Sequence, residues 1–599
     1  MKIGNVDIRV KRSRIGKTRY FSIFLMILII FSFSLSAYGT QKQDTSNQQP
    51  AASSQQPATS YLQPATSPSA SLRTGNQQPA ASYQQDLTLS QRINNTFTPM
   101  VDAMAEVLFW DPFSWSGVYD DKVYDAQGEI VLAEDGEPVT APLKLIVLWL
   151  IAGGVFFTVF MRFINFRGIR HAIGLIQGKY DSPDDRGEVT HFQALTTALS
   201  ATVGLGNIAG VAIAITIGGP GATFWMILAG IIGMSSKFVE CTLGVKYRKI
   251  SKEGVVSGGA MYYLKYGLKK KKLGLLGIVL AFLFAVMIIG GAIGGGNMFQ
   301  ANQAFKQFEI FFPFMENNGV WYGVGMAFLV GIVIIGGIKS IARVTSKIVP
   351  FMGFLYILTA MVIIGMNISN TGTAFQLIYD GAFSPEALKG GFIGVLIYGF
   401  QRGAFSNEAG IGSASIAHSA AKTEEPVSEG IVALLEPFID TVIICTMTAL
   451  VIIFTGYWDD KSGLLGVQLT SAAFNSVFPW FPYLLLVAVT LFAFSTLISW
   501  SYYGLKGFDY LFGGFGKKIF GTRKVTNRIF QFIFLAFIII GASSDITAVL
   551  DFSDMMILYM AFPNIIGLMI LAPEVRRDLI SYMKRLKSGE IKKNIASGQ

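Results

Sequence analysis

Two stretches of the chain combine glycines with asparagine and hydroxyl side chains inside long apolar segments. The first is Thr202-Val-Gly-Leu-Gly-Asn-Ile-Ala-Gly210, and the second runs from Gly399 to Gly412. Each glycine inside a helix costs about 1 kcal/mol relative to alanine, so three glycines within seven residues favour local unwinding. Unwound backbone at membrane depth has to line a cavity or bind a ligand, because unsatisfied amides are costly in lipid. Its free N–H groups suit a carboxylate, and its carbonyl and hydroxyl oxygens suit a sodium ion.

The positions of the two stretches are related. They lie five predicted helices apart and cross the membrane in opposite directions, which is the arrangement of an inverted repeat with discontinuous helices. Asn207 and Asn407 stand beside the two expected breaks. The alternative is that the glycines serve close helix packing, since Gly206 and Gly210 form a GxxxG pair. The sequence therefore predicts a ligand site at two helix breaks and leaves close packing as the competing explanation.

The composition is that of a membrane protein. Hydrophobic residues make up 52% of the 599 residues and charged residues only 14%, where a soluble domain carries about 25% charge. The net charge of +10 does not indicate nucleic-acid binding, because Lys and Arg stand in short loops between apolar segments. With two cysteines, three histidines and no HExxH or GxSxG motif, we expect no disulfide framework, no zinc site, no cofactor and no enzyme activity.

Eleven apolar segments are long enough to cross a bilayer. Lys and Arg clusters follow the odd-numbered segments, with the loop after the seventh as an exception, so odd-numbered segments are expected to end in the cytoplasm. We therefore expect a multi-pass protein of the cell (inner) membrane, with the mature N-terminus outside and the C-terminus inside. The segments are roughly residues 143–163, 192–217, 222–245, 275–300, 321–338, 347–368, 389–409, 428–455, 481–504, 526–544 and 553–572.

Regions of different composition flank this core, which we place at residues 143–575. Residues 1–40 have a basic start followed by a short apolar run, typical of a signal peptide or signal anchor. Residues 41–90 are rich in Gln, Pro and Ser and predict a disordered linker. Residues 91–142 are interpreted as a short extracytoplasmic segment and residues 576–599 as a basic cytoplasmic tail.

Three motifs also carry a resemblance to a known family. The stretches Thr196–Gly210, Arg402–Ala414 and Phe492–Gly504 resemble signatures of the alanine or glycine:cation symporter family, over about residues 143 to 575. The stretch Val203–Asn207 is also similar to the first core helix of the neurotransmitter:sodium symporters. The resemblance implies a leucine-transporter-like fold: an all-α membrane protein of eleven transmembrane helices with a five-plus-five inverted repeat and discontinuous helices at about 192–217 and 389–412.

The resemblance also implies which residues bind ligands. The residues expected to bind substrate are Gly204, Gly206, Asn207, Gln300, Gly403, Phe405, Ser406 and Trp500, and those expected to bind sodium are Thr202, Val203, Ser495 and Thr496. Two alternatives stay open. Gln300 could instead bridge two helices, and the hydroxyls of Ser495 and Thr496 could bond to their own helix backbone.

The implied function is symport of a small neutral amino acid, alanine or glycine, with sodium as the coupling ion. The alternative is a proton-coupled amino-acid symporter of the same fold, in which a buried Asp or Glu carries the proton. The sequence does not determine the oligomeric state.

For several ionisable residues the sequence suggests a partner or a location. Lys237 and Glu240, three residues apart at a predicted helix end, are expected to form a surface pair. Arg402 and Glu408 are interpreted either as partners in an internal ion pair or gate, or as part of a structural pair near the cytoplasmic mouth. His418 falls in a predicted cytoplasmic loop and is given no role in proton transfer.

Overall fold

The computed structural model describes Asp111, Ile130 and residues 145–383, 392–459, 463–464, 466–544 and 546–591. The predictions for residues 1–40 and 41–90, and those for 91–142 apart from Asp111 and Ile130, lie outside the described residues. Within the described part, the regular structure is helical except for the antiparallel pair β1 (Lys249–Ile250) and β2 (Val256–Ser257) and one isolated bridge between Val189 and Ala421. The predicted all-α class is confirmed for this part of the chain.

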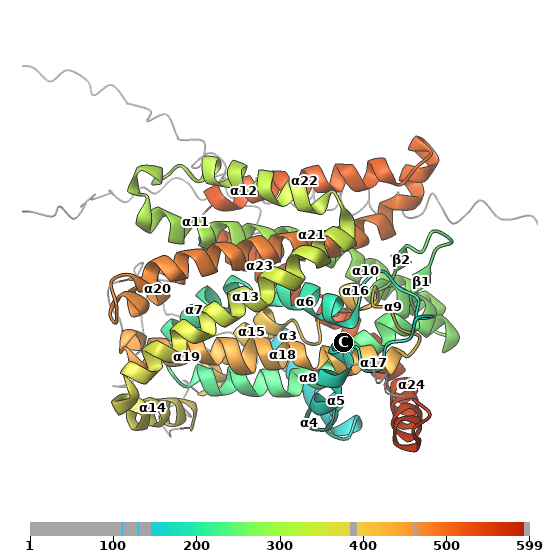
Figure 1. Ribbon diagram of the computed structural model, residues 1–599, viewed down its shortest axis with the longest axis horizontal. Coiled ribbons are helices and arrows are strands. Elements are labelled where there is room, and N and C mark those ends of the chain that lie inside the picture. The colour runs from blue at the N-terminus through green and yellow to red at the C-terminus, as the bar shows by residue number, and fades with distance from the viewer. Residues whose placement is uncertain are drawn as a thin grey trace, which may run out of the picture. The chain divides into compact units, whose positions relative to one another are not determined.

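Long apolar helices run side by side through the bundle (Figure 1). Seven described helices are long and apolar enough to cross a membrane, and the bent pair α6 and α7 makes up to eight. Two further apolar helices, α3 (Leu145–Phe160) and α12 (Gly319–Ile334), are shorter. The seven helices are α8 (Ala222–Lys246), Gly274–Phe311, α13 (Gly337–Met366), Pro426–Phe454, α21 (Phe481–Phe520), α22 (Lys524–Ser543) and Phe552–Ser588.

Three of these spans contain several elements. Gly274–Phe311 comprises α10 (Gly274–Ile293), the π-helix η4 (Gly294–Met298) and α11 (Phe299–Phe311). Pro426–Phe454 comprises α17 (Pro426–Ala433), α18 (Leu435–Pro437), the π-helix η8 (Phe438–Cys445) and α19 (Thr446–Phe454). The last span joins the end of α23 (Ile546–Leu558) to α24 (Ala561–Ser588), which extends into the predicted basic tail.

The remaining helices are short connections or lie beside the spans. They are α4 (Ile164–Arg167), α5 (Ile169–Ile176), α9 (Ala260–Lys270), η5 (Pro313–Met315), η6 (Ile368–Asn370), α14 (Thr371–Phe383), α15 (Phe392–Asn407), α16 (Ser415–His418), η9 (Tyr457–Asp459) and α20 (Val467–Asn475). In their described residues, the eleven predicted segments coincide with a helix or a broken helix, α15 being the helix of the seventh segment.

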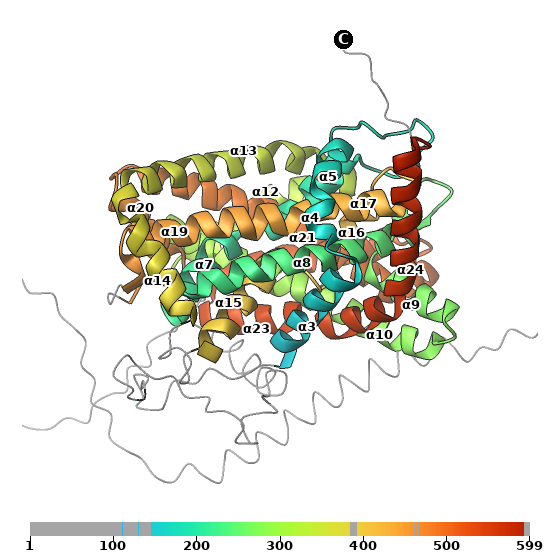
Figure 2. The ribbon, with the colours of Figure 1, turned by 90° about the horizontal axis from the view of Figure 1, so that it is seen from below.

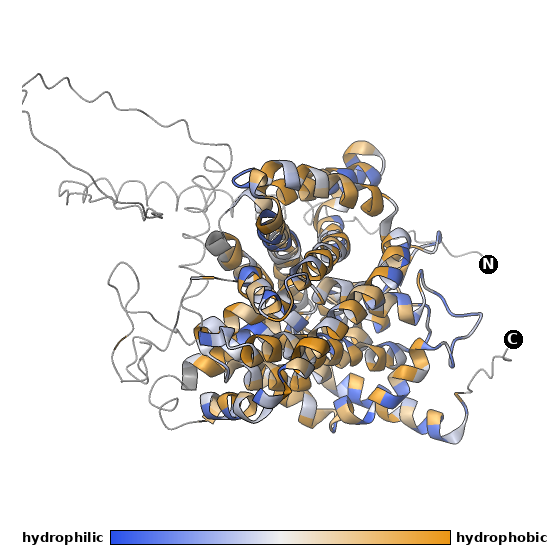
Figure 3. Ribbon diagram, turned by 60° about the vertical axis from the view of Figure 1, so that its left-hand side comes forward, coloured by the Kyte–Doolittle hydropathy of each residue, from blue (hydrophilic) through white to orange (hydrophobic). Residues whose placement is uncertain are grey.

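The outward side chains of several helices are apolar. Phe328 on α12, Phe354 on α13 and Phe532 on α22 are 69%, 66% and 73% exposed. Figure 3 shows that hydrophobic residues make up most of the length of these helices. Extended apolar surfaces of this kind are uncommon on soluble proteins. They suit contact with lipid, because the helices already satisfy their own backbone hydrogen bonds.

The first predicted break is confirmed. Helix α6 (His191–Thr202) ends before Gly204, the single turn η3 (Leu205–Asn207) follows, and α7 (Ala209–Gly218) continues at an angle of 55° to α6. Gly204 has an extended backbone, with φ −138° and ψ −153°. The interruption therefore lies within the glycine-rich stretch from Thr202 to Gly210.

The second break begins later than its glycines indicate. Helix α15 runs without interruption through Gly399 and Gly403, and the irregular segment starts at Glu408, where φ is 55°. A Cβ atom on Gly399 would lie 2.6 Å from the Cβ of Trp225 on α8, and one on Gly403 would lie 3.1 Å from that of Ala229. These two glycines thus allow α15 to pack closely on α8. At these positions the explanation by close helix packing holds.

Candidate functional site at the two helix breaks

The break between α6 and η3 is held by polar side chains. The Gly204 amide donates to Asn207 Oδ1 at 2.8 Å, and the Leu205 amide donates to Gln300 Oε1 at 2.9 Å. Gln300 Nε2 in turn donates to the carbonyl oxygen of Gly295 at 2.9 Å. In this conformation Gln300 bridges helix α11 and the break, so both ends of its amide group are engaged.

The other side of the break faces helix α21. A Cβ atom on Gly204 would lie 2.6 Å from Thr496 Oγ1, so a larger residue would displace that hydroxyl. Thr496 Oγ1 is buried and has no hydrogen-bond partner among the described residues. The neighbouring Ser495 Oγ donates to the carbonyl oxygen of Phe492 at 3.0 Å, in its own helix. Buried hydroxyls are normally paired, so the Thr496 oxygen is the group here that is available to a ligand.

Backbone oxygens stand at the same place. Among the described residues, no hydrogen bond reaches the carbonyl oxygens of Thr202 and Val203, which lie where α6 ends. The Thr202 side chain is engaged with its own helix, because its Oγ1 lies 3.4 Å from the carbonyl oxygens of Ala198 and Leu199. Thr202 and Val203 therefore offer backbone oxygens rather than side-chain groups.

A buried carboxylate lies directly against both breaks. Asp440, on the π-helix η8, accepts a hydrogen bond from Asn207 Nδ2 at 2.7 Å and from Ser406 Oγ at 2.8 Å. Thr441 Oγ1 donates to the same carboxylate at 2.8 Å. These donors are neutral, and no described Lys, Arg or His forms an ion pair with Asp440. Asp440 falls within the apolar segment predicted at residues 428–455, and no sequence pattern connects it with Asn207.

The second break joins the same cluster through Asn407 and Trp500. Asn407 Nδ2 donates to Thr441 Oγ1 at 3.1 Å, and the Ala409 amide donates to Asn407 Oδ1 at 2.9 Å. Trp500 Nε1 lies 3.2 Å from the carbonyl oxygen of Ala201 and 3.2 Å from Glu408 Oε1. A single indole therefore contacts the end of α6 and the start of the second break.

Most of the predicted site residues come together here. A Cβ atom on Gly206 would lie 3.6 Å from the Cα of Ser406 and 3.7 Å from the ring of Phe405. The Phe405 ring packs edge-on against Phe299, with centroids 5.6 Å apart. Gly403, by contrast, faces Ala229 and Met226 of α8 rather than the break in α6.

The expected partnership of Arg402 and Glu408 is wrong. Arg402 forms an ion pair with Asp554 on α23, which also accepts a hydrogen bond from Gln401 Nε2 at 2.6 Å. Glu408 instead accepts hydrogen bonds from Ser413 Oγ and Trp500 Nε1. The two side chains have different neighbours because Arg402 lies within α15, whereas Glu408 follows the end of α15, where the chain enters the left-handed region.

The expected surface pair of Lys237 and Glu240 is also wrong. Both side chains are fully buried on α8. Lys237 Nζ lies 3.1 Å from Glu436 Oε2, and Glu240 accepts a hydrogen bond from Asn564 Nδ2 at 3.0 Å. Both residues point into the bundle because α17, α18 and α24 cover this face of α8.

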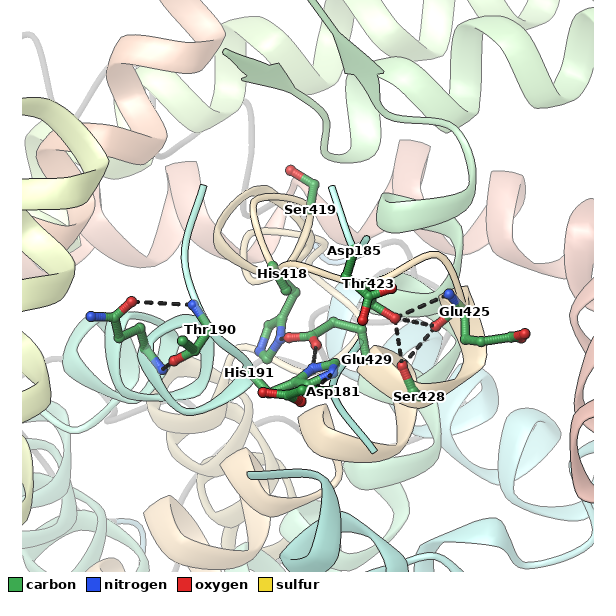
Figure 4. A network of polar contacts seen from close by, with 12 residues as sticks. Asp181, Asp185, Thr190, His191, His418, Ser419, Thr423, Glu425, Ser428 and Glu429 are labelled. Carbon is green, nitrogen blue, oxygen red and sulfur yellow. Dashed lines mark hydrogen bonds and ion pairs between the residues drawn. The ribbon is translucent and has the colours of Figure 1, made fainter. Parts of the chain in front are cut away.

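His418, which the sequence places in a cytoplasmic loop, is buried within an ionic network (Figure 4). Its ring contacts Glu429 through Nδ1 and Glu436 through Nε2, each at 2.5 Å. Glu429 also pairs with His191, at the start of α6, and Glu436 pairs with Lys237. Burial by itself would lower the pKa of His418, but the carboxylates of Glu436 and Glu429 outweigh it and raise the pKa to about 9.

Helices that break inside an apolar bundle, around buried polar groups, are the architecture of secondary membrane transporters. The sodium:alanine symporter family model matches residues 132–596. The chain is 39% identical over 465 residues to the sodium/alanine symporter AgcS of Methanococcus maripaludis, covering 76% of this chain and 96% of that protein. It is 33% identical over 448 residues to the amino-acid carrier protein AlsT of Bacillus subtilis, covering 74% and 91% of the two chains.

A solved structure of MhsT in complex with L-phenylalanine aligns with 66% of this chain and 99% of that chain, at 15% identity and a TM-score of 0.45. The match to the family model and the identity to AgcS show that the chain is a secondary transporter, not an enzyme. It belongs to the sodium:alanine symporter family.

Proposed function

We propose that this protein carries a small neutral amino acid, alanine or glycine, into the cell together with sodium, by alternating access. The observation that carries the proposal is the Asp440 carboxylate, which is fully buried among neutral donors at the junction of two helix breaks. A buried charge without an opposite partner costs several kcal/mol. A sodium ion beside Asp440 would remove that cost and would be bound only when the surrounding helices are arranged to hold it.

A second sodium position is proposed at the end of α6. The carbonyl oxygens of Thr202 and Val203 and the unpartnered hydroxyl of Thr496 are hard oxygen ligands on facing elements. Ser495 is expected to join them by rotating its hydroxyl away from Phe492. Loss of the ion would leave these oxygens unpaired, which couples sodium release to a change at the break.

The substrate is expected to lie between the two breaks. Its carboxylate would bind near the amides of Gly204, Leu205 and Gly206, as Asn207 and Gln300 yield their present hydrogen bonds. The aromatic rings of Phe405 and Trp500 would limit the side chain to hydrogen, methyl or a group of similar size. Asn207, Gln300 and Ser406 are buried, so entry and exit require the helices to move.

The proposal includes the membrane arrangement. We expect eleven crossings in a five-plus-five inverted repeat, with an extracytoplasmic N-terminus and a cytoplasmic C-terminus, because Lys and Arg follow the odd-numbered segments. The bend in α6–α7 and the irregular segment after α15 are the breaks that such a repeat would relate.

A proton-coupled symporter of the same fold is the second candidate. Asp440 also supports this alternative, because protonation of the carboxylate would neutralise its unpaired charge just as a bound sodium ion would. In that case the hydroxyl donors of Ser406 and Thr441 would reorient toward the protonated group.

Uptake by the full-length protein in proteoliposomes decides between the two. We expect labelled alanine to accumulate under an inward sodium gradient and not when choline replaces sodium. Excess unlabelled glycine should compete, whereas phenylalanine should not. Accumulation in choline driven by an inward proton gradient would establish the proton-coupled alternative, and uptake that is indifferent to both ions would refute symport.

A further inference from the structure

A basic groove lies at the end of the bundle where α3 passes into α4. The groove has a volume of about 310 Å³ and lies between this turn and helix α24. Six of its lining side chains are apolar, among them Phe160 and Leu579, and none is acidic. The other five are Arg162, Arg167, Arg576, Lys584 and Lys587.

Among the described residues, none of the five cations forms an ion pair, whereas two other cations at α24, Lys246 and Arg585, do. Lys246 pairs with Glu574 at 2.8 Å and also with Asp578, and Arg585 pairs with Glu425 at 2.6 Å. One face of α24 is thus joined to the bundle by ion pairs, while the face toward the groove presents positive charge alone. The groove therefore offers a site for an anion that the described protein does not itself supply.

The groove is held in shape on both sides. Arg162 and Phe163 both have φ of 56°, which turns the chain sharply between α3 and α4. Arg167 Nη1 donates to the carbonyl oxygen of Arg162 at 3.3 Å, which ties α4 to this turn. Across the groove, the guanidinium of Arg576 lies 4.8 Å from the centre of the Phe160 ring, a cation–π contact between α24 and α3.

The position of α24 relates this groove to a membrane surface. Pro573 lies inside α24, and in Figure 2 the red end of α24 runs across the direction of α8 and α19. Because the spans run along the membrane normal, the end of α24 that crosses their direction lies close to the plane of the interface, while the earlier part of α24 belongs to the last span. Phe166 and Ile580 are 62% and 56% exposed beside the groove, so apolar side chains face outward next to the cations.

We propose that this groove binds the headgroup of an anionic phospholipid from the predicted cytoplasmic leaflet. The phosphate would lie among Arg162, Arg167 and Arg576, with Lys584 and Lys587 at the outer rim, since arginine binds phosphate oxygens by paired N–H donors. The apolar lining and the exposed Phe166 and Ile580 would contact the acyl chains. A free phosphate ion would leave this apolar surface without a role, which is why a lipid is the occupant that fits.

Lipid binding to the purified full-length protein in detergent tests the proposal. The probe is dioleoyl phosphatidylglycerol, with dioleoyl phosphatidylcholine and inorganic phosphate as comparisons, and the readouts are bound lipid by native mass spectrometry and the shift of the melting temperature. We expect phosphatidylglycerol to bind and to raise the melting temperature, and neither comparison to do so. The combined change Arg162→Gln, Arg167→Gln and Arg576→Gln should weaken phosphatidylglycerol binding at least tenfold.

Two further variants keep the test decisive. The combined change Lys517→Gln, Lys518→Gln and Lys524→Gln removes the same charge from exposed positions elsewhere, and it should alter binding less than twofold. Lys584→Gln with Lys587→Gln changes exposed residues at the end of α24, where folding is not at risk, and should weaken binding about threefold. Equal binding by the arginine variant and the control, or full competition by inorganic phosphate at equal concentration, would overturn the proposal.

Discussion

Two buried groups of polar side chains differ in how their charges are arranged. One is the polar cluster at the helix breaks, formed around Asp440 by Asn207, Ser406 and Thr441. The other is the ionic network of His191, Lys237, His418, Glu429 and Glu436. In the network each charged side chain meets an opposite one: Glu429 contacts His191 and His418, and Glu436 contacts His418 and Lys237. In the cluster the carboxylate of Asp440 meets only neutral donors. The charges of the network are balanced within the protein, whereas the charge of Asp440 has no ion-pair partner among the described residues, and we propose that a cation binds there.

Helix α6 connects the two regions. Its first residue, His191, belongs to the network, and its last residue, Thr202, reaches the break. The network also ties α6 to α16, α17, α18 and α8, so it holds one end of α6 in place. We interpret the network as a structural anchor and the cluster as the ligand-dependent part, and each prediction below tests one side of this difference.

The largest effect is expected from Asp440→Asn. The change keeps the size of the side chain and removes its charge, and uptake of alanine should fall roughly 1,000-fold, equivalent to about 4 kcal/mol, as expected when a buried charge partner is lost. Sodium-driven uptake in proteoliposomes measures the effect. Asp459→Asn, at an exposed position, serves as the control and should transport normally. Near-normal uptake by Asp440→Asn would remove this carboxylate from the ion site.

The next effect is one of stability rather than transport affinity. Glu436→Gln leaves the buried Lys237 ammonium without its partner at 3.1 Å and should destabilise the fold by about 3 kcal/mol, because an uncompensated buried charge is costly. Thermal unfolding in detergent measures this loss. Combining it with Lys237→Met should restore part of the lost stability, since the orphaned charge is then absent. A double variant as unstable as the single one would contradict the pairing.

Thr496→Ala, alone and together with Ser495→Ala, tests the second sodium position. Removing one hydroxyl ligand should raise the sodium concentration for half-maximal uptake about tenfold, the equivalent of about 1.4 kcal/mol, with expression unchanged. Thr490→Ala is a suitable control, because the Thr490 hydroxyl bonds to its own helix at Leu486. An unchanged sodium requirement in the double variant would exclude both residues from the ion site.

The smallest effect concerns pH. The folded-state pKa of His418, about 9, lies above its ordinary value of 6.5. The stabilisation from the charged ring is therefore fully present below about pH 6.5 and is lost as the pH rises toward 9. We expect the free energy of unfolding to fall as the pH rises between these values. His418→Gln should flatten this dependence in thermal unfolding measurements, and a slope that persists in the variant would assign it to other groups.

Local sequence patterns were sufficient to predict part of the fold and of the site. Glycine spacing predicted the break after Thr202 because backbone propensity is a short-range property, and apolar length predicted the spans. The partners of Arg402 and Lys237 could not be predicted in this way. Asp554 and Glu436 are 152 and 199 residues away from them in the chain, and several carboxylates in apolar segments were equally plausible partners.

By itself the sequence determined the membrane class, the helical content and the position of the first break, since these follow from hydrophobicity and backbone preferences within about twenty residues. Only the tertiary structure decided that Asp440 faces Asn207, that Gly403 packs on α8 and that His418 is buried between two glutamates. The physical reason is that the burial and charge of a polar side chain depend on which helices pack against it. Those neighbours come from distant parts of the chain.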